Sequence, residues 1–163
     1  MKTLKEIEKL YPYQFAGKNI GLSIANGWLP EFYELCKNID DLLGENKRSF
    51  HWVQLKEKFG SARYYWSVKG KQDSVRVDCI SPKKVVSYKT NPPASKSEPQ
   101  ALFDQLSKII DAVEAKTHTH CIVCGALGKI DQREGYVLVL CDLHSKLRAD
   151  GGDLDIWPKA DDE

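Results

Sequence analysis

The chain has 163 residues, of which 42% are apolar and 29% charged, and its net charge is +1. This length allows one ordinary core, or a main domain with a small satellite, and excludes two large domains. No run approaches the roughly 18 consecutive apolar residues of a membrane-spanning helix, and the first residues lack the apolar core of a signal peptide. We therefore expect a soluble, cytoplasmic protein without membrane contact.

The small net charge hides two oppositely charged segments. Residues 61–97 contain eight Lys or Arg against two Asp, whereas residues 98–163 contain seven against thirteen Asp or Glu. One interpretation is that these charges lie on separate solvated faces or meet within the chain. The other is that the basic segment is a surface for an acidic partner.

Two helices are predicted in the first 45 residues. A short helix over residues 3–10 is ended by Pro12, and a stronger helix follows Gly27 and ends at Gly44. The second helix carries one apolar stripe, formed by Trp28, Phe32, Leu35, Ile39 and Leu42.

Alternation of apolar and polar residues then replaces the helical period. Residues 49–56 and 62–68 alternate as two strands, and the short glycine-containing segment 57–61 between them predicts an antiparallel hairpin. Two further short strands, rich in β-branched residues, are predicted at 75–80 and 84–88. We expect these strands to form a small antiparallel sheet.

The composition divides the chain into three parts. Residues 1–96 form a helix and antiparallel-sheet domain that ends in a proline-rich loop. Residues 97–149 begin with a helix capped by Ser97 and continue into a cysteine-containing segment packed on that helix. Residues 150–163 form an acidic tail, which we expect to be partly disordered. The predicted fold class is α+β, with a small antiparallel sheet and flanking helices.

Four residues near the carboxyl end have the spacing of a zinc site. Cys121 and Cys124 are separated by two residues, and Cys141 and His144 repeat this spacing after sixteen intervening residues. Two such knuckles satisfy tetrahedral Zn²⁺ as a closed Cys3His site, so we expect one structural zinc ion and no catalysis at the metal. Residues 136–140 are predicted to be a strand entering the second knuckle. The predicted α+β fold, a small antiparallel sheet with flanking helices, therefore ends in a carboxyl-terminal zinc ribbon packed on the helix of residues 97–149.

Alternatives to this ligand set stay open. His118 or His120 could replace His144 as the fourth ligand, and Cys121 with Cys124 could instead be a redox pair or unrelated cysteines. Cys36 is better explained as a buried thiol in the apolar stripe of the second helix.

The sequence contains little sign of an enzyme. It has neither the zinc-deaminase pattern, nor a phosphate-binding glycine-rich loop, nor a nucleophile elbow. A metal-dependent nuclease with His118 or His120 as its base is an alternative, but no cluster of carboxylates and histidines supports it. We therefore predict a protein without catalytic residues.

The predicted hairpin and the basic segment supply candidate contacts with a partner. Aromatic residues dominate binding energy at protein interfaces, and aromatics interleaved with basic residues can also bind nucleic acid. Trp52, Tyr64 and Trp66 qualify only if their face of the hairpin is exposed, and a buried core position is the competing explanation, as it is for Trp28. The candidate partner-binding residues are Lys56, Lys58, Arg63, Tyr64, Arg76, Lys83 and Lys84.

Four stretches resemble a group of small proteins encoded by phages and prophages that end in a zinc ribbon. They are Leu10-Tyr11-Pro12 with Phe15, Asn26-Gly27-Trp28-Leu29 leading to Leu35-Cys36, Leu55-Lys56-Glu57-Lys58-Phe59-Gly60 with Arg63-Tyr64-Tyr65, and the two zinc knuckles with Gly125. The likeness spans most of the chain, but residues 67–97 are longer here than the group leads us to expect.

The resemblance implies a phage origin and a location in the cytoplasm of an infected bacterial cell. The group has no assigned activity. By analogy with other phage accessory proteins, we expect a non-enzymatic protein that docks on a host protein, including one of the host's defence machinery, or on a phage protein. Nucleic-acid binding through the basic and aromatic hairpin is the alternative, although the acidic final third would repel a phosphate backbone.

Overall fold

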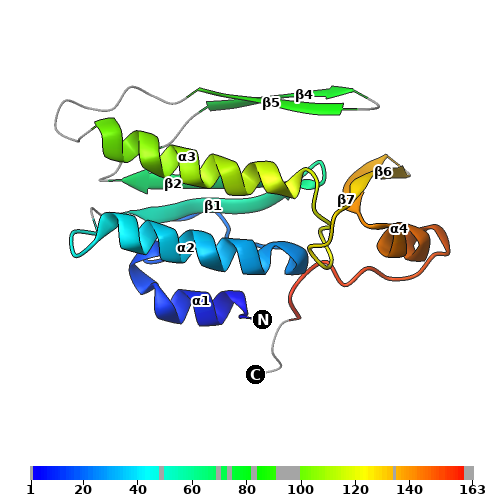
Figure 1. Ribbon diagram of the computed structural model, residues 1–163, viewed down its shortest axis with the longest axis horizontal. Helices are drawn as coiled ribbons and strands as arrows, with labels where there is room; N and C mark the ends of the chain where they lie inside the picture. The colour runs from blue at the N-terminus through cyan, green and yellow to red at the C-terminus, as the bar shows by residue number, and fades with distance from the viewer. Residues whose placement is uncertain are drawn as a thin grey trace.

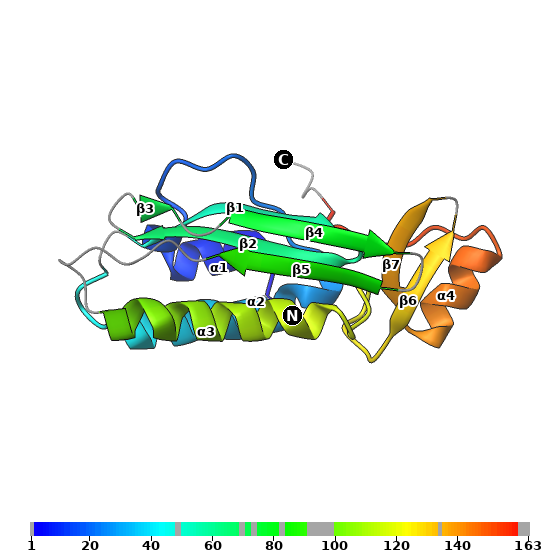
Figure 2. The same cartoon turned by 90° about the horizontal axis from the view of Figure 1, so that it is seen from above.

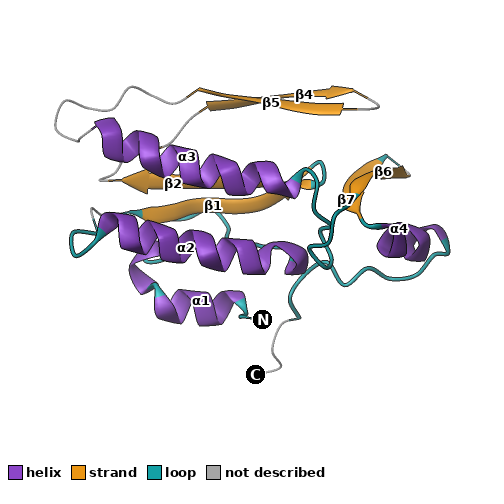
Figure 3. Cartoon of the chain, in the orientation of Figure 1, coloured by secondary structure: helices purple, strands orange, loops and turns teal. Residues whose placement is uncertain are grey.

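The computed structural model describes residues 2–47, 50–68, 71–72, 75–81, 84–90, 100–133 and 135–159. In these residues it has four α-helices and three antiparallel sheets, so the predicted α+β class is confirmed (Figure 1; Figure 3). The elements in chain order are α1 (Leu4–Leu10), η1 (Pro12–Gln14), η2 (Asn26–Trp28), α2 (Leu29–Leu43), β1 (His51–Lys58), β2 (Ser61–Val68), β3 (Lys71–Gln72), β4 (Val75–Ser81), β5 (Lys84–Thr90), α3 (Gln100–Thr117), β6 (Lys129–Arg133), β7 (Tyr136–Leu140) and α4 (Asp142–Ala149).

The two early helices begin and end where the sequence signals place them. Thr3 caps α1 in a capping box with Glu6, whose carboxylate accepts the backbone N–H of Thr3 at 2.7 Å. Gly44 follows α2 with a φ of 59°, a left-handed conformation that a residue without Cβ adopts readily. The predicted cap at Ser97 lies outside the described residues.

The predicted hairpin forms the centre of the fold. β1 and β2 pair antiparallel from Lys58 opposite Ser61 to His51 opposite Ser67, and β3 pairs with the end of β2. α2 and α3 lie side by side on one face of this sheet (Figure 1; Figure 2). The sheet and these two helices enclose the main core.

Aromatic side chains from several elements fill that core. Trp52 and Trp66 are fully buried, and Phe32 of α2 lies 5.3 Å from Trp52 between ring centroids. α3 contributes Phe103, whose ring centroid is 4.8 Å from that of Trp66. α3 therefore shares a core with elements of residues 1–96, although we grouped it with the ribbon from sequence.

Side chains of α3 also occupy the edge of β2 that faces away from β1. The backbone N–H of Ala62 donates to Thr117 Oγ1 at 2.9 Å, and the N–H of Tyr64 donates to Glu114 Oε1 at 2.5 Å. Both acceptors are buried. They satisfy backbone donors that would otherwise need another strand.

β4 and β5 form a separate two-stranded sheet, whereas the sequence suggested a sheet shared with β1 and β2. The physical reason is that α3 already occupies the free edge of β2. Ion pairs hold the β4–β5 hairpin to the body, which we define as α1, α2, β1–β3 and α3. The Asp78 carboxylate oxygens lie 3.2 Å from Arg63 Nη2 and 3.1 Å from Lys58 Nζ, and Lys89 Nζ lies 2.9 Å from Asp111 Oδ1.

The described part of the tail follows the body on the side of α1 (Figure 1). Asn26 binds it twice, because its backbone N–H donates to the Ile156 carbonyl at 2.8 Å and its side-chain amide to the Asp155 carbonyl at 2.9 Å. Leu154 and Ile156 pack against the core. Residues 150–159 thus lie away from β4–β5, the hairpin of the basic segment; residues 160–163 are outside the described range.

None of the described helices is long and apolar enough to cross a membrane.

Candidate metal centre

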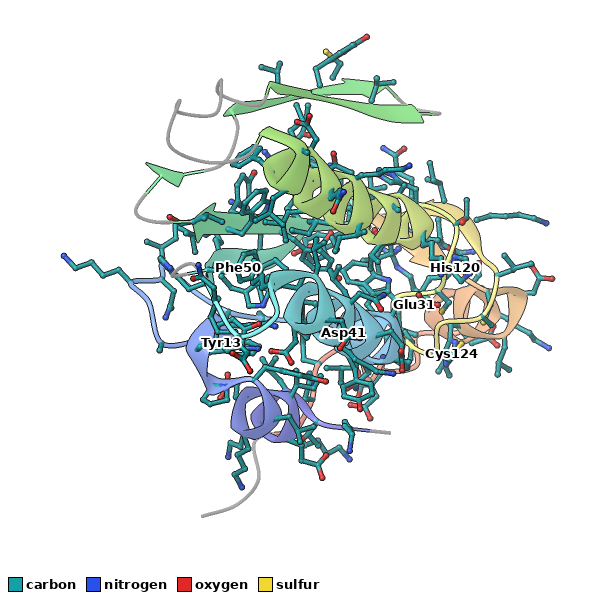
Figure 4. All side chains as sticks on the ribbon, turned by 60° about the vertical axis from the view of Figure 1, so that its left-hand side comes forward. Tyr13, Glu31, Asp41, Phe50, His120 and Cys124 are labelled. Carbon is teal, nitrogen blue, oxygen red and sulfur yellow. The ribbon has the colours of Figure 1, made fainter. Side chains whose placement is uncertain are left out.

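The first knuckle is a tight loop that follows α3. The Cys121 N–H donates to the Ala126 carbonyl at 2.7 Å, and the Gly125 N–H donates to the Cys121 carbonyl at 2.8 Å. Gly125 has a φ of 76°, which permits the chain to turn back within four residues. The loop therefore brings Cys121 and Cys124 to the same side, at the end of the molecule where α3 ends (Figure 4 labels Cys124).

The second knuckle joins β7 to α4. Cys141 is the N-cap residue of α4, and its carbonyl accepts the Ser145 N–H at 2.9 Å. Residues three apart lie on one face of a helix, so the first turn places His144 beside the Cys141 side chain. The predicted strand at 136–140 is confirmed as β7.

The four ligand atoms lie within 4.8 Å of one another. Cys124 Sγ is 3.8 Å from Cys141 Sγ, and His144 Nδ1 is 3.1 Å from Cys141 Sγ and 3.4 Å from Cys121 Sγ. A tetrahedron with metal–sulfur bonds of about 2.3 Å has sulfur–sulfur edges of about 3.8 Å, so this cluster fits a four-coordinate metal ion. In the described part of the chain it is the one group of three or more His, Cys, Asp or Glu residues with such a geometry.

The cysteine pKa values differ across the site. Burial, assisted by the neighbouring Cys121 and Cys141, raises the pKa of Cys124 to about 11. Burial acts in the same direction on Cys141, but hydrogen bonds from the backbone and side chain of His144 outweigh it and lower the pKa of Cys141 to about 7. Three thiol groups this close become thiolates together only when a cation balances their charge.

A buried carboxylate fixes α4, and thereby His144, on the β6–β7 hairpin. Asp131 accepts hydrogen bonds from Ser145 at 2.5 Å, from Arg148 at 3.0 Å and from Arg133 at 3.2 Å. Arg148 also donates to the carbonyls of Arg133 and Tyr136 at 3.1 Å each. This network was not predicted, because its members are scattered polar residues without a spacing signal.

Two glycines allow the ribbon, residues 118–149, to lie directly against the body. The Gly27 N–H donates to the Ile122 carbonyl at 2.9 Å, and a Cβ at Gly27 would overlap the Cys121 carbonyl oxygen. A Cβ at Gly60 would lie 2.9 Å from the backbone nitrogen of Val139. These glycines come from two of the stretches on which the phage-protein resemblance rests, and the contacts give both a structural role.

The structure places His144, rather than His118 or His120, with the three cysteines. His120 Nδ1 instead lies 2.8 Å from the Lys116 carbonyl and 3.1 Å from Thr119 Oγ1. The ligand set read from the knuckle spacing is therefore the one that the fold brings together.

Two predicted partner-binding residues are unsuitable as surface contacts. Arg63 is 0% exposed and Tyr64 is 1% exposed, because both faces of β2 are covered. Trp28, Trp52 and Trp66 are core residues as well. The aromatic face of the hairpin therefore belongs to the interior.

The remaining basic candidates are only partly described. Lys56 Nζ lies over the Tyr65 ring, 5.3 Å from the ring centroid, and Lys58 forms an ion pair with Asp78. Arg76 lies on β4 and Lys84 on β5, but their side chains, like the whole of Lys83, are outside the described part. The structure does not bring these residues into one described patch.

Half of the exposed large apolar side chains lie on the ribbon. Of the ten large apolar residues that are exposed in the described chain, five fall between residues 127 and 147. They are Leu127, Ile130, Tyr136, Leu143 and Leu147; a sixth, Trp157 of the tail, borders a pocket beside α1 instead. This surface was not predicted, because single apolar residues in short segments such as β6 and α4 carry no sequence signal that separates exposed positions from buried ones.

Comparisons of the chain with protein-family models, with curated proteins and with solved structures give no match.

Proposed function

We propose that this chain is a non-enzymatic binding protein whose ribbon, built around one structural zinc ion, docks on another protein. The concentration of exposed apolar side chains on the ribbon carries this proposal. Large exposed apolar side chains gathered in one small module mark interaction sites more often than single scattered ones do.

Zinc is the metal that this donor set favours. Thiolate sulfur and imidazole nitrogen in a tetrahedral arrangement are the usual ligands of structural Zn²⁺. Four protein ligands leave no open position for water or substrate, which favours a structural role over the nuclease alternative. The proposed ligands are Cys121, Cys124, Cys141 and His144.

The orientation of α4 supports a docking role. Ser145 and Arg148 face β6 through Asp131, whereas Leu143 and Leu147 are 71% and 40% exposed. Residues four apart share one helix face, so Leu143 and Leu147 form a short apolar stripe directed away from the ribbon's own strands. α4 has no buried residue of its own.

Nucleic-acid binding has weaker support. Its aromatic candidates and Arg63 are buried, and Lys58 and Lys89 are paired with aspartates. The resemblance described above supports a phage origin, so the partner is sought in the infected bacterial cell, among host proteins, including defence proteins, and phage proteins.

Affinity capture with a matched pair of variants tests the proposal. Leu143→Glu places a charge on the ribbon surface, and Ile20→Glu makes the same change at a residue 74% exposed on the loop beside β1. We expect wild type and Ile20→Glu to recover the same protein from infected cells, and Leu143→Glu to recover at least about tenfold less while keeping its zinc. Equal recovery by both variants, or no partner above background with wild type, would contradict the proposal.

A further inference from the structure

A groove of about 290 Å³ lies where the β1–β2 turn meets the β6–β7 turn. The described residues that line it are Glu57, Lys58, Phe59, Gly135, Tyr136 and Val137. Its volume is at the lower end of the range of about 300–1,000 Å³ for small-molecule sites. The groove therefore suits one anchoring side chain better than a whole cofactor.

Phe59 stands in the groove in an unfavourable backbone conformation. Its φ is 54°, the one positive value among the described residues other than glycine, and Gly60 follows with 77°. A hairpin turn with two positive φ values favours Asn-Gly, and an aromatic residue there costs about 1–2 kcal/mol. The turn is held in place from both sides, because Glu57 Oε1 accepts the Gly60 N–H at 2.6 Å and Gly60 packs on the backbone of β7. The backbone therefore gives no reason for a phenylalanine at this position.

Tyr136 supplies the opposite wall and is 65% exposed. It lies at the start of β7, opposite Arg133 in the register of the β6–β7 hairpin. Two aromatic residues from turns far apart in the sequence thus border one groove, and both have an exposed edge toward solvent. This is the composition of a pocket for an apolar anchor.

Among the described residues at this edge, the more exposed charges are positive. Lys58 lines the groove, and Arg133 lies opposite Tyr136 in the β6–β7 register. Their side chains are 46% and 44% exposed, whereas their carboxylate partners Asp78 and Asp131 are only 7% and 6% exposed. Glu57 is turned onto the Gly60 N–H, and burial raises the pKa of its carboxyl group. Among the described residues, the two cations at this edge are therefore more exposed than the carboxylates that pair with them.

We propose that this groove receives an apolar side chain from an acidic segment of the partner protein, with Phe59 and Tyr136 holding the apolar group and Lys58 and Arg133 facing the partner's carboxylates. This inference rests on the proposed protein-binding function. It adds the chemistry of the partner and the place of its anchor.

Phe59→Asn separates a binding role from a structural one. Asparagine removes the aromatic wall but suits the positive φ, so the variant should melt at the same temperature as wild type or slightly above it. If Phe59 had a structural role, the same change would lower the melting temperature. Tyr136→Ala removes the second wall from an exposed position and serves as an independent variant.

The probes are capped synthetic peptides with a central Leu or Phe flanked by Asp and Glu. Matched peptides replace the acids by Asn and Gln, replace the acids by Lys, or replace the anchor by Ala. We expect the acidic peptide to shift the amide NMR signals of Gly60, Gly135 and Val137, with affinity falling as salt rises. Each of Phe59→Asn and Tyr136→Ala should weaken binding at least about tenfold, and the neutral and alanine peptides should bind more weakly than the acidic one.

Three results would overturn the inference. The first is binding of the acidic peptide to Phe59→Asn with the affinity of wild type. The second is an equal or larger response of wild type to the Lys peptide or to an oligonucleotide. The third is the absence of any amide NMR shift in wild type at millimolar acidic peptide. Capture from infected cells separates this failure from failure of the proposed function. A partner recovered equally by wild type and Phe59→Asn leaves the docking function standing and removes the groove from it.

Discussion

The body and the outer part of the ribbon are stabilised in different ways. The body encloses a continuous core in which large aromatic side chains such as Trp52, Trp66 and Phe32 are fully or almost fully buried. β7 of the ribbon contributes to the same core, whereas α4 buries no residue and is held by the buried Asp131 network beside the Cys/His cluster. The packing of α4 therefore depends on polar contacts and, in our proposal, on a metal ion, and its exposed apolar side chains are not used within the chain.

Loss of the metal should have the largest effect, and it should be confined to the ribbon. Cys121→Ser removes one ligand, and structural zinc contributes about 10–16 kcal/mol to the folding of small zinc modules. We expect a variant without zinc, with an unfolded ribbon and a retained near-ultraviolet circular dichroism signal from the buried tryptophans. Cys79→Ser changes an exposed cysteine outside the cluster and should keep its zinc. A Cys121→Ser protein with full metal content would contradict the assignment.

Trp66→Ala tests the body in the same way. Trp66 is 0% exposed and packs on Phe50 and Phe103, so its removal leaves a large cavity and should cost about 3–5 kcal/mol of unfolding free energy. Chemical denaturation measures this loss, and zinc content should stay at the wild-type level while the protein is folded. Trp157→Ala, at a residue 43% exposed, is the matched control and should cost about 1 kcal/mol or less. Similar losses in both variants would argue against a body core centred on Trp66.

Gly27→Ala addresses the contact between the two regions. An added methyl group would overlap the Cys121 carbonyl oxygen and lie 2.7 Å from the Gly125 nitrogen, both of them backbone atoms that cannot yield easily. We expect a loss of about 2–3 kcal/mol in denaturation, together with weaker zinc retention against a chelator. Gly44→Ala is the control: its Cβ would meet no atom within 4 Å, and the positive φ at this position should cost about 1 kcal/mol and leave zinc retention unchanged.

Glu57→Gln should have the smallest effect, visible mainly as a pH dependence. Burial raises the pKa of the folded Glu57 carboxyl above its ordinary value, so its charged form is disfavoured in the fold. The stability contributed by the neutral form is present at low pH and is lost as pH rises through the raised pKa. The melting temperature of Glu57→Gln relative to that of wild type should therefore rise as the pH is raised from 4 to 7. A shift in the opposite direction would show that Glu57 is stabilised as a carboxylate.

Local signals in the sequence predicted the elements that depend on local physics. Gly44 and the apolar stripe before it predicted α2, alternation predicted the β1–β2 hairpin, and paired knuckle spacing predicted the four ligands that the fold brings together. Each of these features depends on residues close in the chain or on a fixed spacing. That is the information a single sequence carries.

Features that depend on distant contacts were not predicted. α4 is eight residues long and mostly polar, and it is held by Asp131 from another element. Arg63 was predicted as a surface residue because alternation assumes one solvated face, whereas both faces of β2 are covered. The β4–β5 hairpin forms its own sheet because Glu114 and Thr117, about fifty residues from β2 in sequence, take that strand's edge donors.

The metal content of purified wild-type protein, measured by mass spectrometry together with thermal melting with and without a chelator, tests the central claim most directly. We predict one zinc ion per chain. Chelation should melt the ribbon at a lower temperature while the buried tryptophans of the body keep their signal. Zinc well below one ion per chain, tightly bound iron or manganese instead, or a melt that the chelator leaves unchanged would contradict a ribbon built on zinc.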